Sequence, residues 1–458
     1  MSDTLMISVS GMRGHVGTDL TPELVARHAA ALGAWVRSGA TAGGRPVVVL
    51  GRDARTSGPM FARAAAAGLM SVGVDVVDLG VVPTPTVQLA VEHHHAGAGL
   101  ILTASHNPIE WNALKFVGPD GIFLDAAAGE RVRALAEQGP GRAGWDGIGE
   151  VREDPEAVAR HLEAILRLPV IDVAAIQRRK FHVGLDCVRG AGAVAVLPLL
   201  ERLGCKVSGI NLEPDGRFPR PPEPVPENLG ELARLVRESG ADLGLAVDPD
   251  VDRLAVVDER GRAIGEDYTL AFAVRAVLDG RSKPATNATV VVNLSTSLVV
   301  EDAARAVGAE VLRAPVGEAN VARAIREHGA VIGGEGNGGV MYPALHIGRD
   351  APLGVALILH LLATSGVTVS GLVDWSPRYT IVKAKGPRSS ELGPLYERLR
   401  RRFADAAADD RDGLRLAWAD RWLHIRPSGT EPIVRLIAEA PTPAEAEALV
   451  AAGRELLQ

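Results

Sequence analysis

Residues 45–80 read RPVVVLGRDARTSGPMFARAAAAGLMSVGVDVVDLG, and this stretch decides the fold. It begins with an apolar, β-branched run and passes through a polar loop into an alanine-rich segment of helical period. A second apolar run follows after a glycine. Period and length identify the stretch as a β-α-β unit. Near-continuous apolar strands such as residues 47–50 are typical of a parallel sheet that helices cover on both faces.

The same plan recurs twice along the chain. Residues 180–210 (KFHVGLDCVRGAGAVAVLPLLERLGCKVSGI) and 288–315 (ATVVVNLSTSLVVEDAARAVGAEVLRAP) each combine a strand, a helical stretch and a second strand. The remainder, from about residue 371, mixes strands with a predicted helix over residues 392–410 and lacks that rhythm. We therefore predict an α/β protein with three related α/β domains, whose sheets are mixed and largely parallel, and a smaller C-terminal α+β domain, arranged around a central cleft.

The predicted domains span residues 1–152, 153–254, 255–368 and 369–458. The proline-rich stretch EPDGRFPRPPEPVPENLG, residues 213–230, is predicted to be an ordered surface loop inside the second domain, because a helix and a strand follow it immediately.

Composition argues against several classes of protein. The chain has 458 residues and a net charge of -7 without a lysine-rich block, so we expect binding to neither nucleic acid nor membranes. Cys187 and Cys205 show no CxxC spacing, which favours a reducing compartment. The start of the sequence lacks a signal-peptide pattern, and the apolar segment from Ala351 is short for a bilayer span. We predict a cytoplasmic protein in which that segment is a buried helix.

Three aspartates end one predicted strand in LGLAVDPDVDRLAVVDERG, residues 243–261. The spacing of Asp248, Asp250 and Asp252 in extended chain places all three carboxylates on one side. Three like charges there require a cation, and oxygen ligands favour Mg²⁺.

Two other interpretations of the aspartates stay open. One is a solvated polar turn. The other is a calcium loop of the pattern D-x-D-x-D-G-x5-E, with Glu259 at position twelve. Arg253 stands where the calcium loop needs glycine, and the flanks are predicted strands rather than helices.

A serine lies beside a histidine in LILTASHNP, residues 100–108. Ser105 and His106 fall in a loop at the carboxyl end of a predicted parallel strand, where open α/β sheets bind ligands. The serine is not in G-x-S-x-G, so a hydrolase nucleophile elbow is not supported, and a plain turn is the alternative. Lys115 downstream supplies a cation, and Arg13, flanked by glycines, could reach a phosphate, although a surface arginine is the default.

Two later stretches suit a phosphorylated sugar. HIRPSGTEPIVRL, residues 424–436, offers a guanidinium fork, two hydroxyls and an accessible backbone, a pattern that favours a phosphate cradle over a helix cap; its residues are Arg426, Ser428, Gly429 and Thr430. GGEGNGGVMYP, residues 333–343, formally contains G-x-G-x-x-G, but no helix is predicted after it. Its Glu335 and Asn337 suit sugar hydroxyls instead.

Taken together, TASHNP, DPDVDR, GEGNGG and RPSGTEP resemble the motifs of the alpha-D-phosphohexomutase family in order and spacing, one motif per domain. That family includes phosphoglucomutases, phosphomannomutases and phosphoglucosamine mutases. The sugar loop is most similar to that of archaeal-type phosphoglucosamine mutases. Asn337 and Gly339 stand where many members have serine and histidine, which leaves the preferred sugar open.

The resemblance implies an isomerase that interconverts hexose 6-phosphate and hexose 1-phosphate through a phosphoserine and a 1,6-bisphosphate. Glucosamine phosphates are the favoured substrates, and glucose or glucosamine 1,6-bisphosphate is the expected activator. The alternatives are a phosphomannomutase or phosphoglucomutase, a serine-dependent phosphatase, and a non-catalytic calcium-binding module.

The implied roles of the residues divide into four groups. Ser105 would be the phosphoserine and would bind Mg²⁺ together with Asp248, Asp250 and Asp252. Sugar hydroxyls would contact Glu335 and Asn337, and the non-reacting phosphate would lie in the cradle of Arg426, Ser428, Gly429 and Thr430. Acid-base and orienting roles would belong to His106, Lys115 and Arg253, and a place near the phosphate to Arg13.

Overall fold

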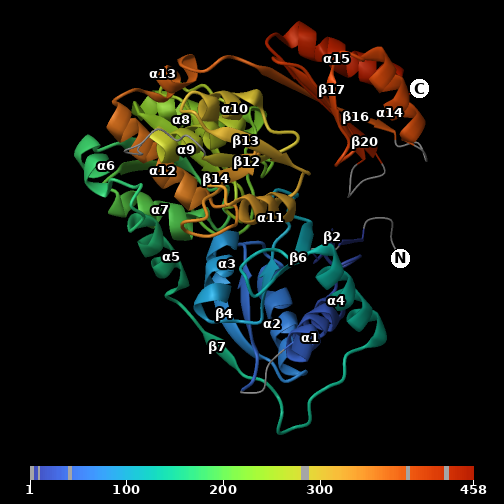
Figure 1. Cartoon of the computed structure of the whole chain (residues 1–458). Coiled ribbons are helices and arrows are strands. Elements are labelled where there is room, and N and C mark those ends of the chain that lie inside the picture. The colour runs from blue at the N-terminus through green and yellow to red at the C-terminus, as the bar shows by residue number, and fades with distance from the viewer. Residues whose placement is uncertain are drawn as a thin grey trace.

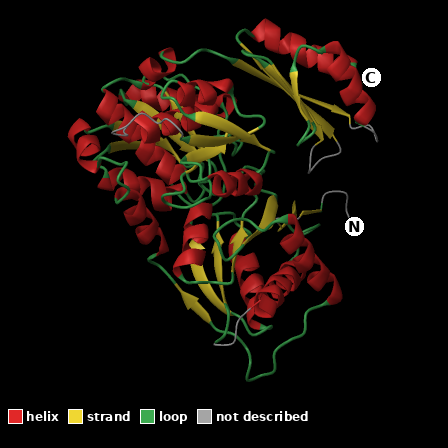
Figure 2. Ribbon diagram, viewed as in Figure 1, coloured by secondary structure: helices red, strands yellow, loops and turns green. Residues whose placement is uncertain are grey.

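The computed structural model describes residues 5–8, 11–39, 44–279, 288–387, 392–427 and 433–457. Within these ranges the chain forms four sheets in succession, of seven, four, four and five strands. The first three are mixed sheets covered by helices, and the fourth is antiparallel, as Figures 1 and 2 show. The predicted fold class is confirmed.

The first sheet contains β1 (Met6–Ser8), β2 (Gly11–His15), β3 (Val47–Arg52), β4 (Asp75–Val81), β5 (Ala98–Leu102), β6 (Trp111–Val117) and β7 (Val151–Glu153). Their order is β1-β2-β6-β5-β3-β4-β7, with β3 parallel to both β4 and β5. Three helices pack on one face: α1 (Pro22–Gly39), α2 (Gly58–Met70) and α4 (Ala126–Gln138). The other face is covered by α3 (Thr84–His93). The β-α-β unit predicted over residues 45–80 is β3-α2-β4.

The second sheet has the order β11-β10-β8-β9, from β8 (His182–Asp186), β9 (Lys206–Ile210), β10 (Leu243–Val247) and β11 (Leu254–Val257). Its helices are α5 (Ala157–Leu166), α6 (Val173–Arg179), α7 (Gly192–Arg202) and α8 (Gly230–Ser239). The proline-rich stretch contains a short 3-10 turn, Pro226–Asn228, and leads directly into α8 and β10. The prediction of an ordered loop within this domain agrees with that path.

The third sheet has the order β13-β12-β14-β15, from β12 (Thr289–Asn293), β13 (Glu310–Ala314), β14 (Ile332–Glu335) and β15 (Gly339–Met341). Its helices are α9 (Asp267–Asp279), α10 (Leu298–Arg305), α11 (Glu318–His328), α12 (Ala351–Ser365) and α13 (Val369–Asp374). One hydrophobic core joins this sheet to the second, with the buried helix α12 in it. Among the described helices, none is long and apolar enough to span a membrane.

The fourth sheet has the order β16-β20-β19-β18-β17, and all its pairs are antiparallel. It contains β16 (Thr380–Pro387), β17 (Ala407–Asp409), β18 (Leu414–Ala417), β19 (Trp422–Pro427) and β20 (Ile433–Ala440), with α14 (Gly393–Arg402) and α15 (Pro443–Glu455) packed on it. The helix predicted over residues 392–410 is wrong in its second half, because Ala407–Asp409 forms β17. Pairing with β18 overrides the helix propensity of alanine there.

Candidate active site

Ser105 and the three aspartates meet although different domains supply them. Ser105 lies in the loop between β5 and β6, and its buried Oγ donates a hydrogen bond of 2.9 Å to Asp248 Oδ2. Asp248 follows directly after β10 of the second sheet. The carboxyl ends of two strands from two sheets therefore face one another at this point.

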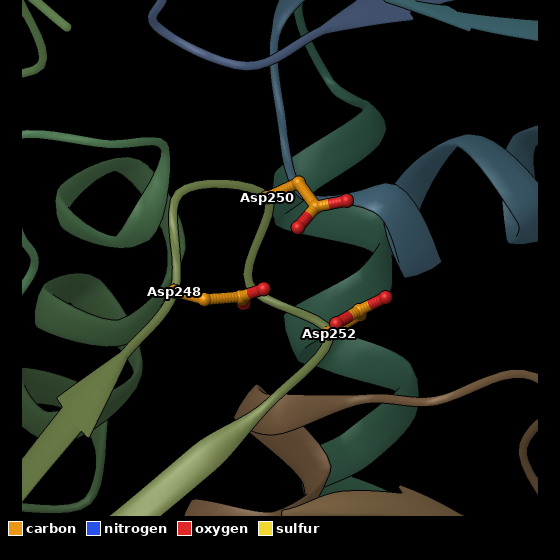
Figure 3. A group of neighbouring side chains, drawn as sticks. All are labelled: Asp248, Asp250 and Asp252. Atoms are coloured by element: carbon orange, nitrogen blue, oxygen red, sulfur yellow. The ribbon is translucent and has the colours of Figure 1, made fainter. Parts of the chain in front are cut away.

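The aspartates form a compact group on the loop between β10 and β11, and Figure 3 shows their side chains extending to the same side of it. One oxygen from each of Asp248, Asp250 and Asp252 lies within 4.8 Å of the others, and all three residues are buried. Because the three aspartates are buried, the interpretation as a solvated polar turn is excluded. Asp250 Oδ1 and Asp252 Oδ1 lack hydrogen-bond partners, so these residues fit a hard divalent cation.

Burial and neighbouring charges act differently on these carboxylates. Burial, followed by the charges of Asp250 and Asp252, raises the pKa of Asp248 well above its usual value. Burial also acts to raise the pKa of Asp250, but the charge and hydrogen bond of Lys115 outweigh it, and the pKa of Asp250 is lowered. Lys115 Nζ, from β6, lies 2.7 Å from Asp250 Oδ2. The first domain thus compensates part of the negative charge of the second.

His106 lies between the serine and an acidic residue of the proline-rich loop. Its Nδ1 is 3.4 Å from Ser105 Oγ, and its Nε2 is 3.8 Å from Glu223 Oε1. The charge of Arg253, together with burial, holds the pKa of His106 well below its usual value and so favours the neutral imidazole. Arg253 itself contacts Glu223 at 3.2 Å and Asp252 at 3.7 Å.

Arg13 also contacts the loop that carries Ser105. Its Nη1 donates a 2.7 Å hydrogen bond to Asn107 Oδ1, and burial lowers the pKa of its guanidinium. Arg13 is therefore held near Ser105 and is not a solvated surface arginine.

The sugar loop is joined to the aspartate loop by Arg349. The Glu335 carboxylate accepts hydrogen bonds from Asn293 Nδ2 (2.9 Å), the Gly317 backbone N–H (3.0 Å) and Arg349 Nη1 (2.9 Å). Arg349 Nη2 contacts Asp252 Oδ2 at 2.5 Å. The predicted sugar ligand Glu335 is thus a buried anchor for Arg349 in this structure, whereas Asn337 is half-buried and its Oδ1 accepts from the Gly339 N–H at 3.3 Å.

The predicted phosphate cradle is described only in part. Arg426 lies on β19, and its Nε is 3.0 Å from Asp412 Oδ2. Ser428, Gly429 and Thr430 lie outside the described residues. The cradle remains a prediction.

The calcium-loop interpretation is not supported by the structure. Glu259, its twelfth position, accepts hydrogen bonds from the backbone N–H and the hydroxyl of Ser370. Its carboxylate is therefore engaged at the start of α13 and not with the aspartates. Strands, not helices, flank the loop.

Two arginines of this site lie outside the motifs that the sequence offers. Arg55 binds the backbone of the serine loop, and Arg349 joins Asp252 to Glu335. Arg55 follows β3 in GRDAR, and its place after a strand was the one weak local signal. The same stretch leads into α2, although the N-cap of that helix, Ser57, makes no capping hydrogen bond with its side chain.

Comparison with known proteins agrees with this geometry. The chain matches all four domain models of phosphoglucomutase/phosphomannomutase: alpha/beta/alpha domain I over residues 5–143, domain II over 159–261, domain III over 265–379, and the C-terminal domain over 389–456. The chain belongs to the phosphoglucomutase/phosphomannomutase family. It is a phosphohexomutase, an isomerase of the intramolecular phosphotransferase class.

Similar members of this family have two kinds of name. A Thermococcus kodakarensis protein named phosphoglucomutase/phosphomannomutase is 38% identical over 98% of this chain and 97% of its own. A Methanopyrus kandleri protein named probable phosphoglucosamine mutase is 39% identical over 94% and 93%. The crystal structure of a phosphoglucomutase/phosphomannomutase family protein from Burkholderia thailandensis has a TM-score of 0.84 and 27% identity, covering 99% of this chain and 98% of its own.

Proposed function

We propose that this phosphohexomutase carries its phosphoryl group on Ser105 and interconverts glucosamine 6-phosphate and glucosamine 1-phosphate. The observation that carries the proposal is the 2.9 Å hydrogen bond from Ser105 Oγ to Asp248 Oδ2. It places a hydroxyl beside three buried carboxylates that suit a divalent cation. Phosphoryl transfer depends on positioning and on neutralising charge, and this arrangement can supply both.

The proposed cofactor is Mg²⁺, held by Asp248, Asp250 and Asp252 with Ser105. When bound, the ion would neutralise negative charge on the transferring phosphoryl oxygens. Lys115 and Arg253 bring positive charge to the same group, through contacts of 2.7 Å to Asp250 and 3.7 Å to Asp252.

The proposed cycle has two half-reactions. Phospho-Ser105 first gives its phosphoryl group to the free hydroxyl of the sugar phosphate, which breaks the Oγ–P bond and forms a 1,6-bisphosphate. The bisphosphate then turns over and returns its other phosphoryl group to Ser105. In each half-reaction the attacking oxygen loses a proton and the leaving oxygen gains one. In the return step the neutral His106 can accept the serine proton, because its Nδ1 lies 3.4 Å from Oγ. A sugar 1,6-bisphosphate would load the serine and so act as activator.

The sugar preference is argued from the glycine-rich loop. The carboxamide of Asn337 can accept a hydrogen bond from a 2-amino group, which favours glucosamine. The name of the Methanopyrus relative agrees with that choice, while the Thermococcus relative favours glucose or mannose phosphates as the alternative. We propose that the sugar contacts Asn337 and also Glu335, whose carboxylate binds Arg349 in this structure, and that Arg426, Ser428, Gly429 and Thr430 hold the phosphate that is not reacting.

The proposed setting is the cytoplasm, with sugar phosphates as partners and neither nucleic acid nor membranes. Two free thiols, Cys187 and Cys205, support a reducing compartment.

Substitution of the serine tests the mutase assignment. Ser105→Ala should lower the rate of 1-phosphate interconversion by about a thousandfold or more, because it removes the phosphoryl carrier. The matched control is Ser38→Ala, on the exposed end of α1, which should retain the wild-type rate. Release of free phosphate by the wild type without formation of an isomer would contradict the proposal and favour a phosphatase.

Initial rates on the 1-phosphates of glucosamine, N-acetylglucosamine, glucose and mannose test the sugar, with Mg²⁺ and the 1,6-bisphosphate present. We expect the highest kcat/KM for glucosamine 1-phosphate. A preference of more than about tenfold for glucose or mannose, equal to roughly 1.4 kcal/mol, would overturn the glucosamine assignment and leave the mutase assignment intact.

A further inference from the structure

Ser105 has a backbone conformation that its own side chain does not favour. Its φ is 50°, in the left-handed region where residues other than glycine are uncommon. Such a conformation persists only where the surroundings hold it. The contacts of the serine loop therefore decide where Oγ lies.

The backbone N–H and carbonyl of Ser105 are both linked to the carboxylate of Asp53, each through one other side chain. The Ser105 N–H donates to Thr103 Oγ1 at 2.9 Å, and the Thr103 hydroxyl donates to Asp53 Oδ2 at 2.7 Å. Arg55 Nε donates to the same Asp53 oxygen at 3.0 Å, and Arg55 Nη2 donates to the Ser105 carbonyl at 2.7 Å. These hydrogen bonds close a ring around the peptide groups of the serine.

Arg55 makes further bonds along the same loop. Its Nη2 also donates to the Asn107 carbonyl at 2.6 Å, and its Nη1 donates to the carbonyls of Pro108 (2.6 Å) and Trp111 (2.9 Å). All the N–H donors of the guanidinium are thus used, and Arg55 is fully buried. Lysine has fewer donors and no planar fork, so it cannot reproduce this set.

The second domain covers the guanidinium. Phe218, from the proline-rich loop, places its ring centroid 4.9 Å from the Arg55 guanidinium carbon. Gly216, at φ 71°, brings that loop so close that a Cβ would lie 2.1 Å from the Ala54 carbonyl oxygen. The proline-rich loop, whose Glu223 contacts His106 and Arg253, therefore also packs against Arg55.

We propose that Arg55 is a positioning residue for phosphoryl transfer. By binding the backbone carbonyls of the serine loop, it fixes the position of Ser105 Oγ next to the aspartates. The inference rests on the proposed function of Ser105. Arg55 acts through the carbonyl groups and contacts neither the hydroxyl nor the substrate. Displacing a reacting oxygen by about 1 Å costs on the order of a hundredfold in rate.

The test is the single-turnover rate of Ser105 phosphorylation by glucose 1,6-bisphosphate with Mg²⁺, together with steady-state kcat and KM. Arg55→Lys should lower the phosphorylation rate and kcat by about a hundredfold while KM changes by less than about threefold. Thr103→Val, which removes the acceptor of the Ser105 N–H, should give the same pattern. The matched control is Arg415→Lys, a buried arginine of β18 outside this loop, which should keep the wild-type kcat.

Chemical rescue separates positioning from folding. Millimolar guanidinium should raise the phosphorylation rate of Arg55→Ala by about tenfold and leave that of Thr103→Val unchanged. If folded Arg55→Lys and Thr103→Val phosphorylate Ser105 at the wild-type rate, or if kcat falls only in proportion to the folded fraction, the inference is overturned. If the wild type itself gains no phosphate on Ser105, the proposed function fails instead.

Discussion

Lys115 of the first domain places a positive charge beside the aspartate loop. Its side chain is largely buried, and its Nζ contacts Asp250 Oδ2 at 2.7 Å. Thr84 Oγ1 binds the same oxygen at 3.0 Å, so Asp250 is held from two segments of the first sheet's domain. A lysine in this position can stabilise charge on a transferring phosphoryl group.

Replacing this lysine should impair turnover more than folding. We expect Lys115→Met to lower kcat by about a hundredfold or more, because the charge next to Asp250 is lost. Lys206→Met, on the exposed edge of β9, is the control and should behave as wild type in the same mutase assay. Equal kcat values for the two variants would contradict a role for Lys115 in the reaction.

The loop between β10 and β11 is built to keep three carboxylates together. Val251, between two of them, has a φ of 63°, which is strained for a β-branched residue. Strain of this kind clusters at ligand-binding loops. The neighbouring sugar loop supports it, since the Leu254 N–H donates to the Gly338 carbonyl at 3.1 Å. A Cβ on Gly338 would lie 2.3 Å from the Leu254 carbonyl oxygen, so this approach requires glycine.

Removing the divalent ion should destabilise this element. Mg²⁺ at a hundredfold excess over its Kd should add about 2.7 kcal/mol to the free energy of unfolding, and chelation should reverse the shift. Asp252→Asn should lose most of the shift, whereas Glu259→Gln should retain it. The measurement is the thermal unfolding midpoint with Mg²⁺ and with a chelator. Loss of the shift in Glu259→Gln would instead favour the calcium-loop interpretation.

The third and fourth domains are joined by buried polar groups. The Glu439 carboxylate, on β20, accepts hydrogen bonds from the Leu298 N–H (2.8 Å), Trp422 Nε1 (2.6 Å) and the Ser297 hydroxyl. It therefore caps α10 from another domain. His424 Nδ1 lies 2.8 Å from Ser295 Oγ. These contacts join the fourth domain, which Figure 1 shows at the upper right, to the third domain.

Stability should depend on pH through Asp267 at this junction. Burial, with the charges of Glu439 and Glu266, raises the pKa of Asp267 to about 8. An unfolded aspartate titrates near pH 3.9, so the folded state binds the extra proton between these values. The free energy of unfolding should therefore fall as pH rises through this interval, by up to about 1.4 kcal/mol per pH unit.

Asp267→Asn keeps the oxygen that accepts from the Ser297 N–H at 2.9 Å and removes the ionisation. Urea unfolding between about pH 5 and pH 8 should show a shallower pH dependence for the variant than for the wild type. Identical slopes would show that Asp267 does not hold the proton in the folded state.

Several site residues could be predicted because their signal is local. Asp248, Asp250 and Asp252 follow one strand at a spacing of two, and Ser105 follows another strand, so the sequence indicates that all four lie near strand ends. The aspartates converge through a turn in which Val251 has a φ of 63°, and not through the extended chain that their spacing predicts. Arg349 gave no such signal. It links Asp252, Glu335 and Glu318, which lie on separate segments that only folding brings together.

The sequence by itself determined the β-α-β order and the α+β character of the last domain, and it indicated candidate residues for binding a cation and carrying phosphate. Hydrophobic period and residue chemistry are properties of short segments, and no distant contact is needed to read them. Tertiary structure decided that Ala407–Asp409 is a strand, that the Glu335 carboxylate binds Arg349, and that Arg55 binds the serine loop. Each of these depends on hydrogen-bond partners distant in sequence or on sheet pairing, and desolvation on burial makes such partners obligatory.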